Sequence, residues 1–312
     1  MSVKVVVAAN NKENTEAWRD RFAAAHSDLQ FIAWEAGQPS HDARYAIVWK
    51  PAGDVFRQER ALKAVFNLGA GVDALTSLRE LPPSLPIVRI EDAGMGRQMI
   101  EYVLHALMRV SRRFDRYAAQ QHDGRWQPLP AIRYDEWPVG VMGLGAIGRQ
   151  VAQAVAYMGY PVAGWSRRPQ TVDQVTPFSG REALPDFLRR TRVLVNVLPL
   201  TAQTQDILNR DTLSLLRPGG YLINVARGAH VVDEDLLALI DAGHLEGATL
   251  DVFREEPLPA GHPYWTHPSI NMTPHIAAIT LEQDTVAQIM AKIKRLERDE
   301  PITGIVERST GY

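Results

Sequence analysis

The sequence predicts an α/β protein of two domains, each built on a parallel sheet. Its 312 residues are about twice the length of a common single domain, and one large domain is the alternative. Hydrophobic residues make up 46% and charged residues 22% of the chain, so there is enough apolar side chain for sizeable cores. Short apolar runs alternate with helical patterns, as in sheets whose parallel strands are joined by helices.

The first third of the chain is predicted to form a small α/β domain. It opens with a strand over 3–9 and a helix over 15–26, in which Trp18 and Phe22 lie four residues apart on one face. Further strands are expected over 31–34, 46–49 and 64–68. A long helix over 98–117 and an irregular segment over 120–137 suit a passage between domains.

After residue 137, strand and helix patterns alternate again, and more clearly than in the first third of the chain. Strands are expected over 138–142, 161–166, 193–198, 221–225, 248–252 and 270–273. These six strands make a complete doubly wound set. A last helix, over 281–298, comes too late to be needed for that sheet and is expected to return to the first domain.

Charge and cysteine content exclude several classes of function. Lys and Arg number 34 against 36 Asp and Glu, a net charge of −2, and no long block of one sign would attract nucleic acid or anionic lipid. With no cysteine, thiolate chemistry and disulfides are impossible. No run approaches the roughly 20 apolar residues of a membrane span, and a cytoplasmic location is expected. The 9 histidines show no spacing typical of metal ligands, so no metal is expected.

A glycine motif follows the strand over 138–142 and opens a helix. Gly143, Gly145 and Gly148 have GxGxxG spacing, which serves a tight turn, close approach of a pyrophosphate and close helix packing. The N–H groups of the helix start, at Ala146 and Ile147, would bind phosphate oxygens. The motif alone is weak, but with both strands and the helix it predicts a dinucleotide site.

The end of the next strand bears on which dinucleotide binds. An NAD-selective site usually has Asp or Glu there, whereas this chain has Ser166, Arg167 and Arg168. Two guanidinium groups would attract a 2′-phosphate that a carboxylate would repel. We therefore expect NADPH as the cofactor and NADH as a weaker one; the alternative is that both arginines are solvated loop charges.

Three potentially reactive side chains follow three successive strands of the second domain. They are Arg227 in NVARG, Glu256 in DVFREEP and His275 in TPHIA. Each alone is commonly a surface charge, a loop residue or a structural histidine. Ligands bind beyond the carboxyl ends of strands in open α/β sheets, so the three together predict one crevice.

The ordered motifs resemble the D-isomer-specific 2-hydroxyacid dehydrogenase family, and more closely its glyoxylate/hydroxypyruvate reductases. The resemblance runs over essentially the whole chain and rests on the glycine motif, LGAGVD at 68–73, LPLTAQT at 198–204, NVARG at 224–228, DVFREEP at 251–257 and TPHIA at 273–277. It implies two Rossmann-like domains, with a doubly wound cofactor domain inserted into a smaller, flavodoxin-like substrate domain. The expected bounds are 98–277 for the former and 1–97 plus 278–312 for the latter, with closure across the cleft to exclude water.

The resemblance also implies the reaction and the catalytic residues. NADPH would reduce small 2-oxo acids, glyoxylate to glycolate and hydroxypyruvate to D-glycerate. Arg227 would hold the substrate carboxylate, His275 would be the acid/base, and Glu256 would partner the histidine. The chemistry agrees, because reduction needs a proton donor near neutrality and a carboxylate keeps an imidazole charged. A guanidinium grips a carboxylate with two parallel hydrogen bonds.

Further contacts are expected on both sides of the reaction. Cofactor contacts are expected at Leu198, Pro199, Thr204, Ala226 and Asp251, the last with a loop cap as alternative. Substrate contacts are expected at Trp49, a pocket wall, and at the N–H groups of Ala70 and Gly71, with a tight structural turn as alternative.

Two rival functions remain open, and the family resemblance also implies a homodimer. One rival is a dehydrogenase for a larger 2-oxo acid or phosphoglycerate. The other is a non-catalytic nucleotide-sensing corepressor, since such proteins share the fold.

Overall fold

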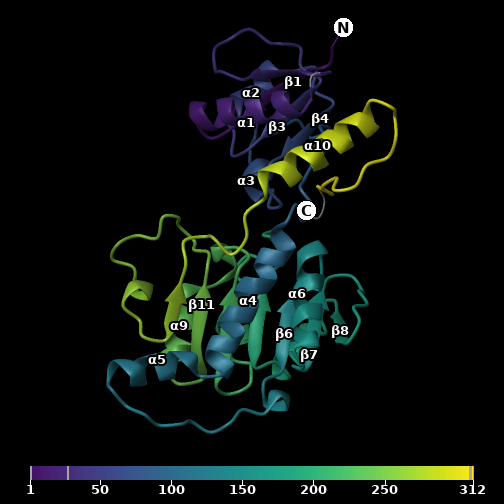
Figure 1. Cartoon of the computed structure of the whole chain (residues 1–312). Helices are drawn as coiled ribbons and strands as arrows, with labels where there is room; N and C mark the ends of the chain where they lie inside the picture. The colour runs from purple at the N-terminus through teal and green to yellow at the C-terminus, as the bar shows by residue number, and fades with distance from the viewer. Residues whose placement is uncertain (1, 27, 309–310, 312) are drawn as a thin grey trace. The chain divides into compact units, whose positions relative to one another are not determined.

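The chain folds into two compact α/β units. The computed structural model describes residues 2–26, 28–308 and 311. One unit comprises the chain through Gly94 together with the chain from Thr280 onward, and the other is Met95–Ile279 (Figure 1). Each unit contains one sheet of parallel strands, which confirms the predicted fold class. Within the described residues, no helix has both the length and the apolar character needed to cross a membrane.

The first unit has a five-stranded sheet in the order β2-β1-β3-β4-β5, which is flavodoxin-like. Its strands are β1 (Lys4–Ala8), β2 (Gln30–Ala33), β3 (Tyr45–Val48), β4 (Ala64–Asn67) and β5 (Ile87–Val88). The strands are apolar because helices cover them; β3 and β4 are buried at every position. β5 was not predicted, because two residues are too few to show a pattern.

The helices of this unit come from both ends of the chain. They are α1 (Lys12–Ala25), α2 (Asp54–Gln58), α3 (Asp73–Thr76) and α10 (Glu282–Leu296). The side chain of Asn11 caps α1 by accepting from the N–H of Asn14. α10 packs on α1, and Arg21 and Glu282 join the two helices at 2.6 Å.

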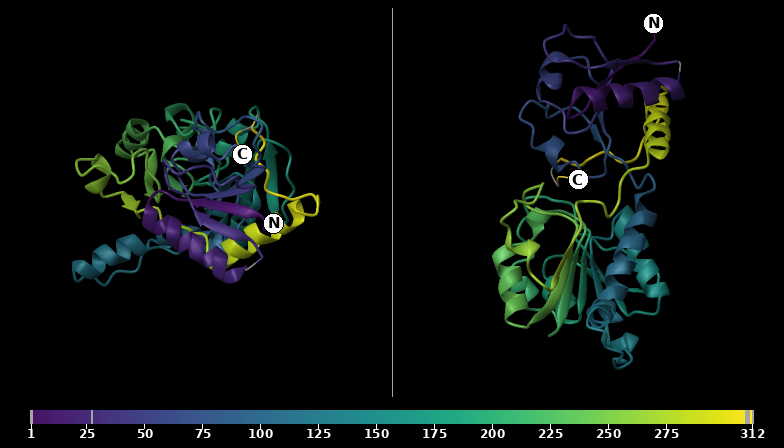
Figure 2. Two further views of the ribbon diagram at one scale, coloured as in Figure 1. Left: turned by 90° about the horizontal axis from the view of Figure 1, so that it is seen from above. Right: turned by 60° about the vertical axis from the view of Figure 1, so that its left-hand side comes forward.

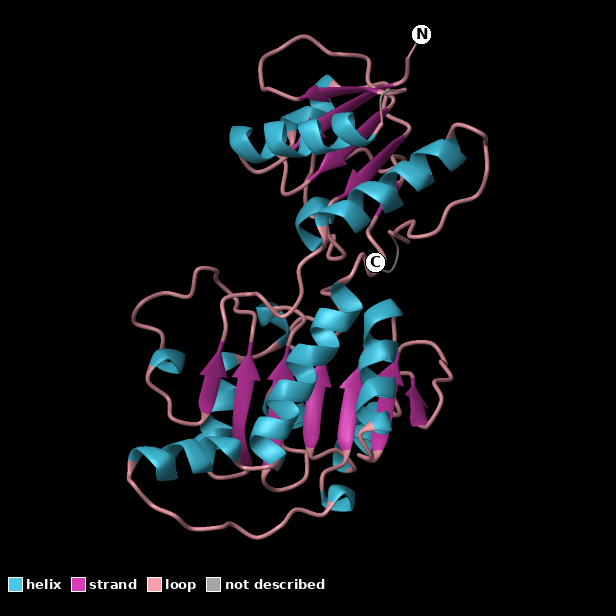
Figure 3. Ribbon diagram, viewed as in Figure 1, coloured by secondary structure: helices cyan, strands magenta, loops and turns pink. Residues whose placement is uncertain are grey.

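The second unit has a seven-stranded sheet in the order β12-β11-β10-β9-β6-β7-β8, and all its arrows point the same way in Figure 3. Its strands are β6 (Val139–Met142), β7 (Val162–Ser166), β8 (Val175–Ser179), β9 (Val193–Asn196), β10 (Gly220–Asn224), β11 (Leu245–Leu250) and β12 (Ile270–Met272). The chain runs outward from β6 through β8, then crosses back to β9 and runs outward the other way. The switch point lies between β6 and β9, where doubly wound sheets bind their ligands.

Helices cover both faces of this sheet (Figure 2, right). α4 (Met95–Ser111) and α6 (Ala146–Tyr157) bury apolar side chains against one face. α7 (Leu184–Arg189), α8 (Arg210–Leu213) and α9 (Asp233–Asp241) do the same on the other. Outside these layers lie α5 (Phe114–His122) and the short 3-10 segments η1 (Tyr134–Glu136), η2 (Gly228–His230) and η3 (Pro263–Trp265).

Two expectations for this unit were wrong. The single helix expected over 98–117 is broken between α4 and α5, because Arg113 has a left-handed backbone with φ of 57°. The edge strand β8 was missed because it contains Pro177 and its middle residues are exposed. A proline in a sequence argues against a β-strand, although an edge strand of a sheet tolerates one.

Candidate active site

The three side chains predicted to be catalytic follow neighbouring strands of the second sheet. Arg227 follows β10, Glu256 follows β11 and His275 follows β12, and these strands pair side by side in that order. All strands are parallel, so these residues leave the sheet at the same edge.

His275 and Glu256 form a direct pair. The Nδ1 atom of His275 lies 2.8 Å from Oε2 of Glu256, and the other carboxylate oxygen accepts from the N–H of Phe253 at 3.0 Å. A carboxylate only accepts, so Nδ1 carries a hydrogen and Nε2 is the nitrogen left to exchange a proton. The His275 side chain is 43% exposed, which leaves the ring accessible to a small molecule.

Buried Asp251 shapes the loop that carries His275. The N–H of His275 donates to the carbonyl of Asp251 at 2.8 Å, and the His275 backbone is left-handed with φ of 57°. Asp251 directly follows β11 and is 1% exposed. Its carboxylate accepts hydrogen bonds from Thr273 Oγ1 and from the N–H groups of Ile276 and Ala277. These contacts are those of the loop cap named as the alternative; the cofactor contact of Asp251 remains a prediction.

Tyr102 extends this arrangement and was not predicted as a site residue. Its hydroxyl lies 2.5 Å from Oγ1 of Thr273, which in turn donates to Asp251. Burial raises the pKa of Tyr102 to about 12, so its hydroxyl keeps its hydrogen and donates. The contact ties α4 to the loop before His275.

Arg227 is held by its neighbours in the turn after β10. The Asn224 side chain donates to the carbonyl of Arg227 at 3.0 Å and accepts from the N–H of Ala226 at 3.2 Å. Gly228 lies against the next loop so closely that a Cβ there would be 1.8 Å from the carbonyl carbon of Phe253. The turn bearing Arg227 and the loop bearing Glu256 are therefore packed backbone to backbone.

The glycine loop after β6 has the shape that a pyrophosphate requires. Gly143 has φ of +101°, and a Cβ on Gly148 would lie 1.8 Å from the Gly143 carbonyl oxygen, so folding itself requires these two glycines. A Cβ on Gly145 would meet nothing within 4 Å. That open space, beside the N–H groups of Ala146 and Ile147 at the start of α6, fits a phosphate group.

Two further loops at this edge contain the other predicted cofactor residues. Ser166 ends β7, and its Oγ donates to the carbonyl of Arg168 at 2.7 Å; the side chains of Arg167 and Arg168 are exposed. After β9, Thr204 Oγ1 donates to the carbonyl of Pro199 at 2.7 Å and closes the loop that begins at Leu198. Ala226, next to Arg227, is buried.

The first unit holds three of the predicted substrate residues: Ala70 and Gly71 lie in the loop after β4, and Trp49 directly follows β3. The Asn67 amide, which the sequence did not single out, donates to the carbonyls of Gly69 and Gly71 at 2.9 and 2.8 Å. The N–H groups of Ala70 and Gly71 donate to no partner among the described residues, which leaves them available to an anion. The Trp49 ring lies over Gly69, where a Cβ would come within 2.4 Å of it.

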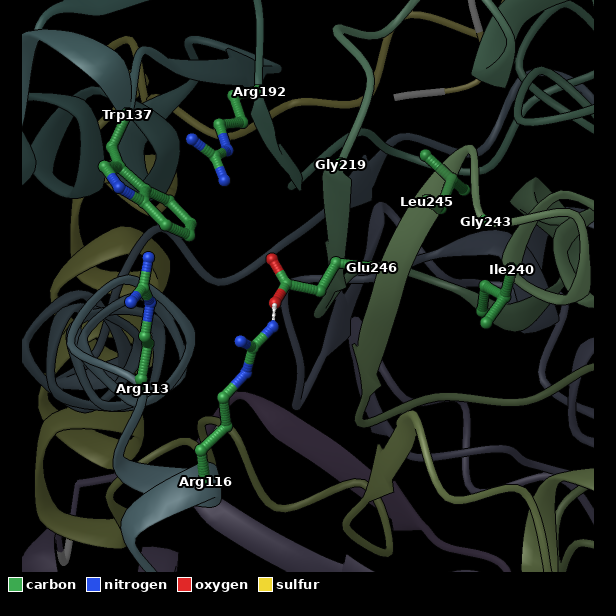
Figure 4. A pocket seen from close by; sticks show the side chains of 9 residues that line it. All are labelled: Arg113, Arg116, Trp137, Arg192, Gly219, Ile240, Gly243, Leu245 and Glu246. Carbon is green, nitrogen blue, oxygen red and sulfur yellow. Dashed lines mark hydrogen bonds and ion pairs between the residues drawn. The ribbon is translucent and has the colours of Figure 1, made fainter. Parts of the chain in front are cut away.

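The second unit also has a hollow of about 430 Å³ at the opposite edge of its sheet (Figure 4). It is lined by Arg113, Arg116, Trp137, Arg192, Gly219, Ile240, Gly243, Leu245 and Glu246. Arg192 lies over the Trp137 ring, 3.7 Å from its centre, and Arg116 pairs with Glu246 at 2.7 Å. Because it lies at the amino ends of β9, β10 and β11, this hollow is distinct from the predicted active site.

The strand order and the glycine loop define a dinucleotide-binding α/β fold, and the comparisons with known proteins agree. Residues 104–277 match the family model described as D-isomer specific 2-hydroxyacid dehydrogenase, NAD binding domain. The chain belongs to this family of enzymes, as the ordered motifs predicted.

Relatives with known names or structures share nearly the whole chain. A glyoxylate/hydroxypyruvate reductase A of Klebsiella pneumoniae (strain 342) is 49% identical over 284 residues, 89% of this chain and 90% of that protein. One from Escherichia fergusonii is 45% identical over 305 residues, 96% of this chain and 97% of that protein. A D-isomer specific 2-hydroxyacid dehydrogenase from Xanthobacter autotrophicus Py2, solved with NADPH and MES, has a TM-score of 0.93 and 37% identity, with 100% of both chains covered. An NADPH-dependent glyoxylate/hydroxypyruvate reductase from Sinorhizobium meliloti, solved with NADP and sulfate, has a TM-score of 0.91 and 33% identity, with 100% of both chains covered.

Proposed function

We propose that this chain reduces small 2-oxo acids with NADPH, converting glyoxylate to glycolate and hydroxypyruvate to D-glycerate. The observation that carries the proposal is the 2.8 Å pair of His275 and Glu256 beside the turn that bears Arg227. The named relatives support the substrate class, and the open space at Gly145 supports the cofactor.

The cofactor and the site residues have separate roles in this reduction. NADPH, when bound, supplies the hydride for the carbonyl carbon of the substrate. His275 donates the proton from Nε2 to the carbonyl oxygen, while Glu256 keeps Nδ1–H in a hydrogen bond and balances the charge of the ring. Arg227 binds the substrate carboxylate and orients the carbonyl towards His275.

An assay of NADPH oxidation with a panel of 2-oxo acids tests this function. Glyoxylate and hydroxypyruvate are expected to have the highest kcat/KM in the panel. A preference for a larger 2-oxo acid or a phosphorylated one would replace the proposed substrates by the first rival. NADPH binding without turnover of any acid would favour the nucleotide-sensing corepressor.

The Glu256→Gln enzyme is expected to reduce glyoxylate more slowly than the wild type. The imidazole must be protonated to act as donor, and a carboxylate stabilises the charged ring whereas an amide does not. We expect kcat, measured from initial rates of NADPH oxidation, to fall by about 10-fold or more. Glu255→Gln, a change at the neighbouring exposed glutamate, is the matched control. A wild-type kcat in Glu256→Gln would contradict the role of the pair.

Arg167 and Arg168 are proposed to select NADPH. In the Arg167→Ala/Arg168→Ala double variant, we expect kcat/KM with NADPH to fall by about 10- to 100-fold, and that with NADH to change by less than about threefold. Arg189→Ala, at an exposed position at the end of α7, controls for a general loss of positive charge. Equal losses with both cofactors would assign the arginines to the loop rather than to the 2′-phosphate.

The first unit is proposed to be the substrate domain, with Trp49, Ala70 and Gly71 as its substrate contacts.

We also propose a homodimer. Large exposed apolar side chains in and after α5 support it: Phe114 is 50%, Trp126 98% and Tyr134 44% exposed. Sedimentation that found only a 34.8 kDa species would exclude the dimer. A cytoplasmic location and the absence of a nucleic-acid partner stay proposals, supported by the lack of cysteine and by the balanced charge.

A further inference from the structure

Three buried polar side chains lie beneath the loops of the candidate active site. Asn196 ends β9, Asn224 ends β10 and His230 ends η2, and each residue is 0% exposed. We call these three residues the amide–histidine network. Buried polar groups cost stability unless they are hydrogen-bonded, so a fully buried set of three calls for a physical reason.

The hydrogen bonds of the network fix the orientation of each group. Asn196 accepts from the N–H of Leu198 at 3.2 Å through Oδ1, so its Nδ2 is the donor to Oδ1 of Asn224 and to Nδ1 of His230, both at 3.0 Å. Since Nδ1 of His230 accepts, Nε2 carries the hydrogen and donates to the carbonyl of Pro199 at 3.3 Å.

The outer bonds of the network reach two different loops. Asn196 and His230 hold the backbone at Leu198 and Pro199, at the start of the loop after β9. Asn224 holds the turn after β10, through the carbonyl of Arg227 and the N–H of Ala226. The Arg227 backbone also accepts from the N–H of His230 at 3.3 Å.

We propose that the amide–histidine network positions Arg227 for the substrate carboxylate, with His230 and Asn196 acting through Asn224. The inference rests on the proposed function, since it assigns Arg227 to a carboxylate. An arginine forms two parallel hydrogen bonds with a carboxylate when its backbone holds the guanidinium in a fixed position and orientation. Apolar residues would fill the same volume but would leave the carbonyl of Arg227 and the N–H of Ala226 without their side-chain partner.

A double-mutant cycle separates positioning from general support of the fold. In the wild-type background, His230→Leu is expected to lower kcat/KM for glyoxylate by about 10- to 100-fold, through a raised KM and a lowered kcat together. In the Arg227→Ala background, the same change is expected to cost less than about threefold, because the group that it misplaces is gone. Equal losses in the two backgrounds would overturn the proposal.

His230→Asn is the matched conservative variant. Its Oδ1 can replace Nδ1 as acceptor for Asn196, whereas the donor to Pro199 is lost. If the network acts through Asn224 on Arg227, His230→Asn keeps more kcat/KM than His230→Leu; equal or greater loss in the Asn variant contradicts that route. Should the Leu variant fail to fold, His230→Asn alone and combined with Arg227→Ala completes the cycle.

Hydrogen exchange of the backbone amides gives a readout that needs no activity. The amides of residues 226–231 are expected to exchange faster in His230→Leu than in the wild type, and those of α6 to be unchanged. If the wild type reduces no 2-oxo acid but this local change appears, the proposed function fails and the structural role of the network stands. If the enzyme is active and exchange over 226–231 is unchanged, the network inference fails alone.

Discussion

Replacement of His275 by alanine is expected to lower kcat for glyoxylate reduction by about 10²- to 10⁴-fold. The ring is the proton donor of the proposed mechanism, with Nδ1 held 2.8 Å from Glu256 and Nε2 left to exchange a proton. The KM for glyoxylate and the affinity for NADPH are expected to change by less than about fivefold, since neither is bound chiefly by this ring. Initial rates of NADPH oxidation and a fluorescence titration of NADPH measure the two quantities.

His267→Ala is the matched control for the loss of an imidazole. His267 also lies 3.2 Å from a carboxylate, that of Asp241, but it precedes β12 and so lies at the other edge of the sheet from His275. Its replacement is expected to leave kcat within about twofold. A His275→Ala enzyme that kept more than a tenth of the wild-type kcat would remove His275 from the proton transfer.

Most of the fold could be predicted because its strands are apolar on both faces. β6, β9 and β10 have no exposed residue, so each appears in the sequence as an unbroken apolar run with one polar residue at most. The edge strand β8 lacks that signal, because its second and third residues, Thr176 and Pro177, are exposed and one of them is a proline. A left-handed residue inside a helical pattern, such as Arg113, also gives no sign when it is not glycine.

The catalytic candidates were predictable for a related reason. Each candidate follows an apolar strand: Arg227 follows β10, Glu256 follows β11 and His275 follows β12. The carboxyl ends of parallel strands lie together, so residues that follow such strands come close to one another. Asp251, which holds the loop of His275, was singled out, but the asparagines beneath Arg227 were not, because a buried amide is recognised by its partner and not by its neighbours in sequence. One signal did exist: β9 and β10 both end in asparagine after apolar residues, at Asn196 and Asn224. Two adjacent strands that end in the same buried amide predict a pair across the sheet.

Arg227→Ala is expected to damage both substrate binding and turnover. The guanidinium is proposed to hold the substrate carboxylate in the ground state and to orient its carbonyl in the transition state, so KM rises and kcat falls together. Losing such a charged contact costs about 2–5 kcal/mol, or roughly 30- to 5,000-fold in kcat/KM. Arg227→Lys keeps the charge without the planar fork and is expected to fall between alanine and wild type.

The control for Arg227 is Arg116→Ala, which removes a guanidinium at the opposite edge of the same sheet. Arg116 pairs with Glu246 at 2.7 Å on the surface, so its loss is expected to change kcat/KM by less than about twofold. NADPH affinity, measured by the same fluorescence titration, separates substrate from cofactor effects. An Arg227→Ala enzyme with raised KM but wild-type kcat would limit the residue to uniform binding, and the orientation of the carbonyl would then have to come from another group.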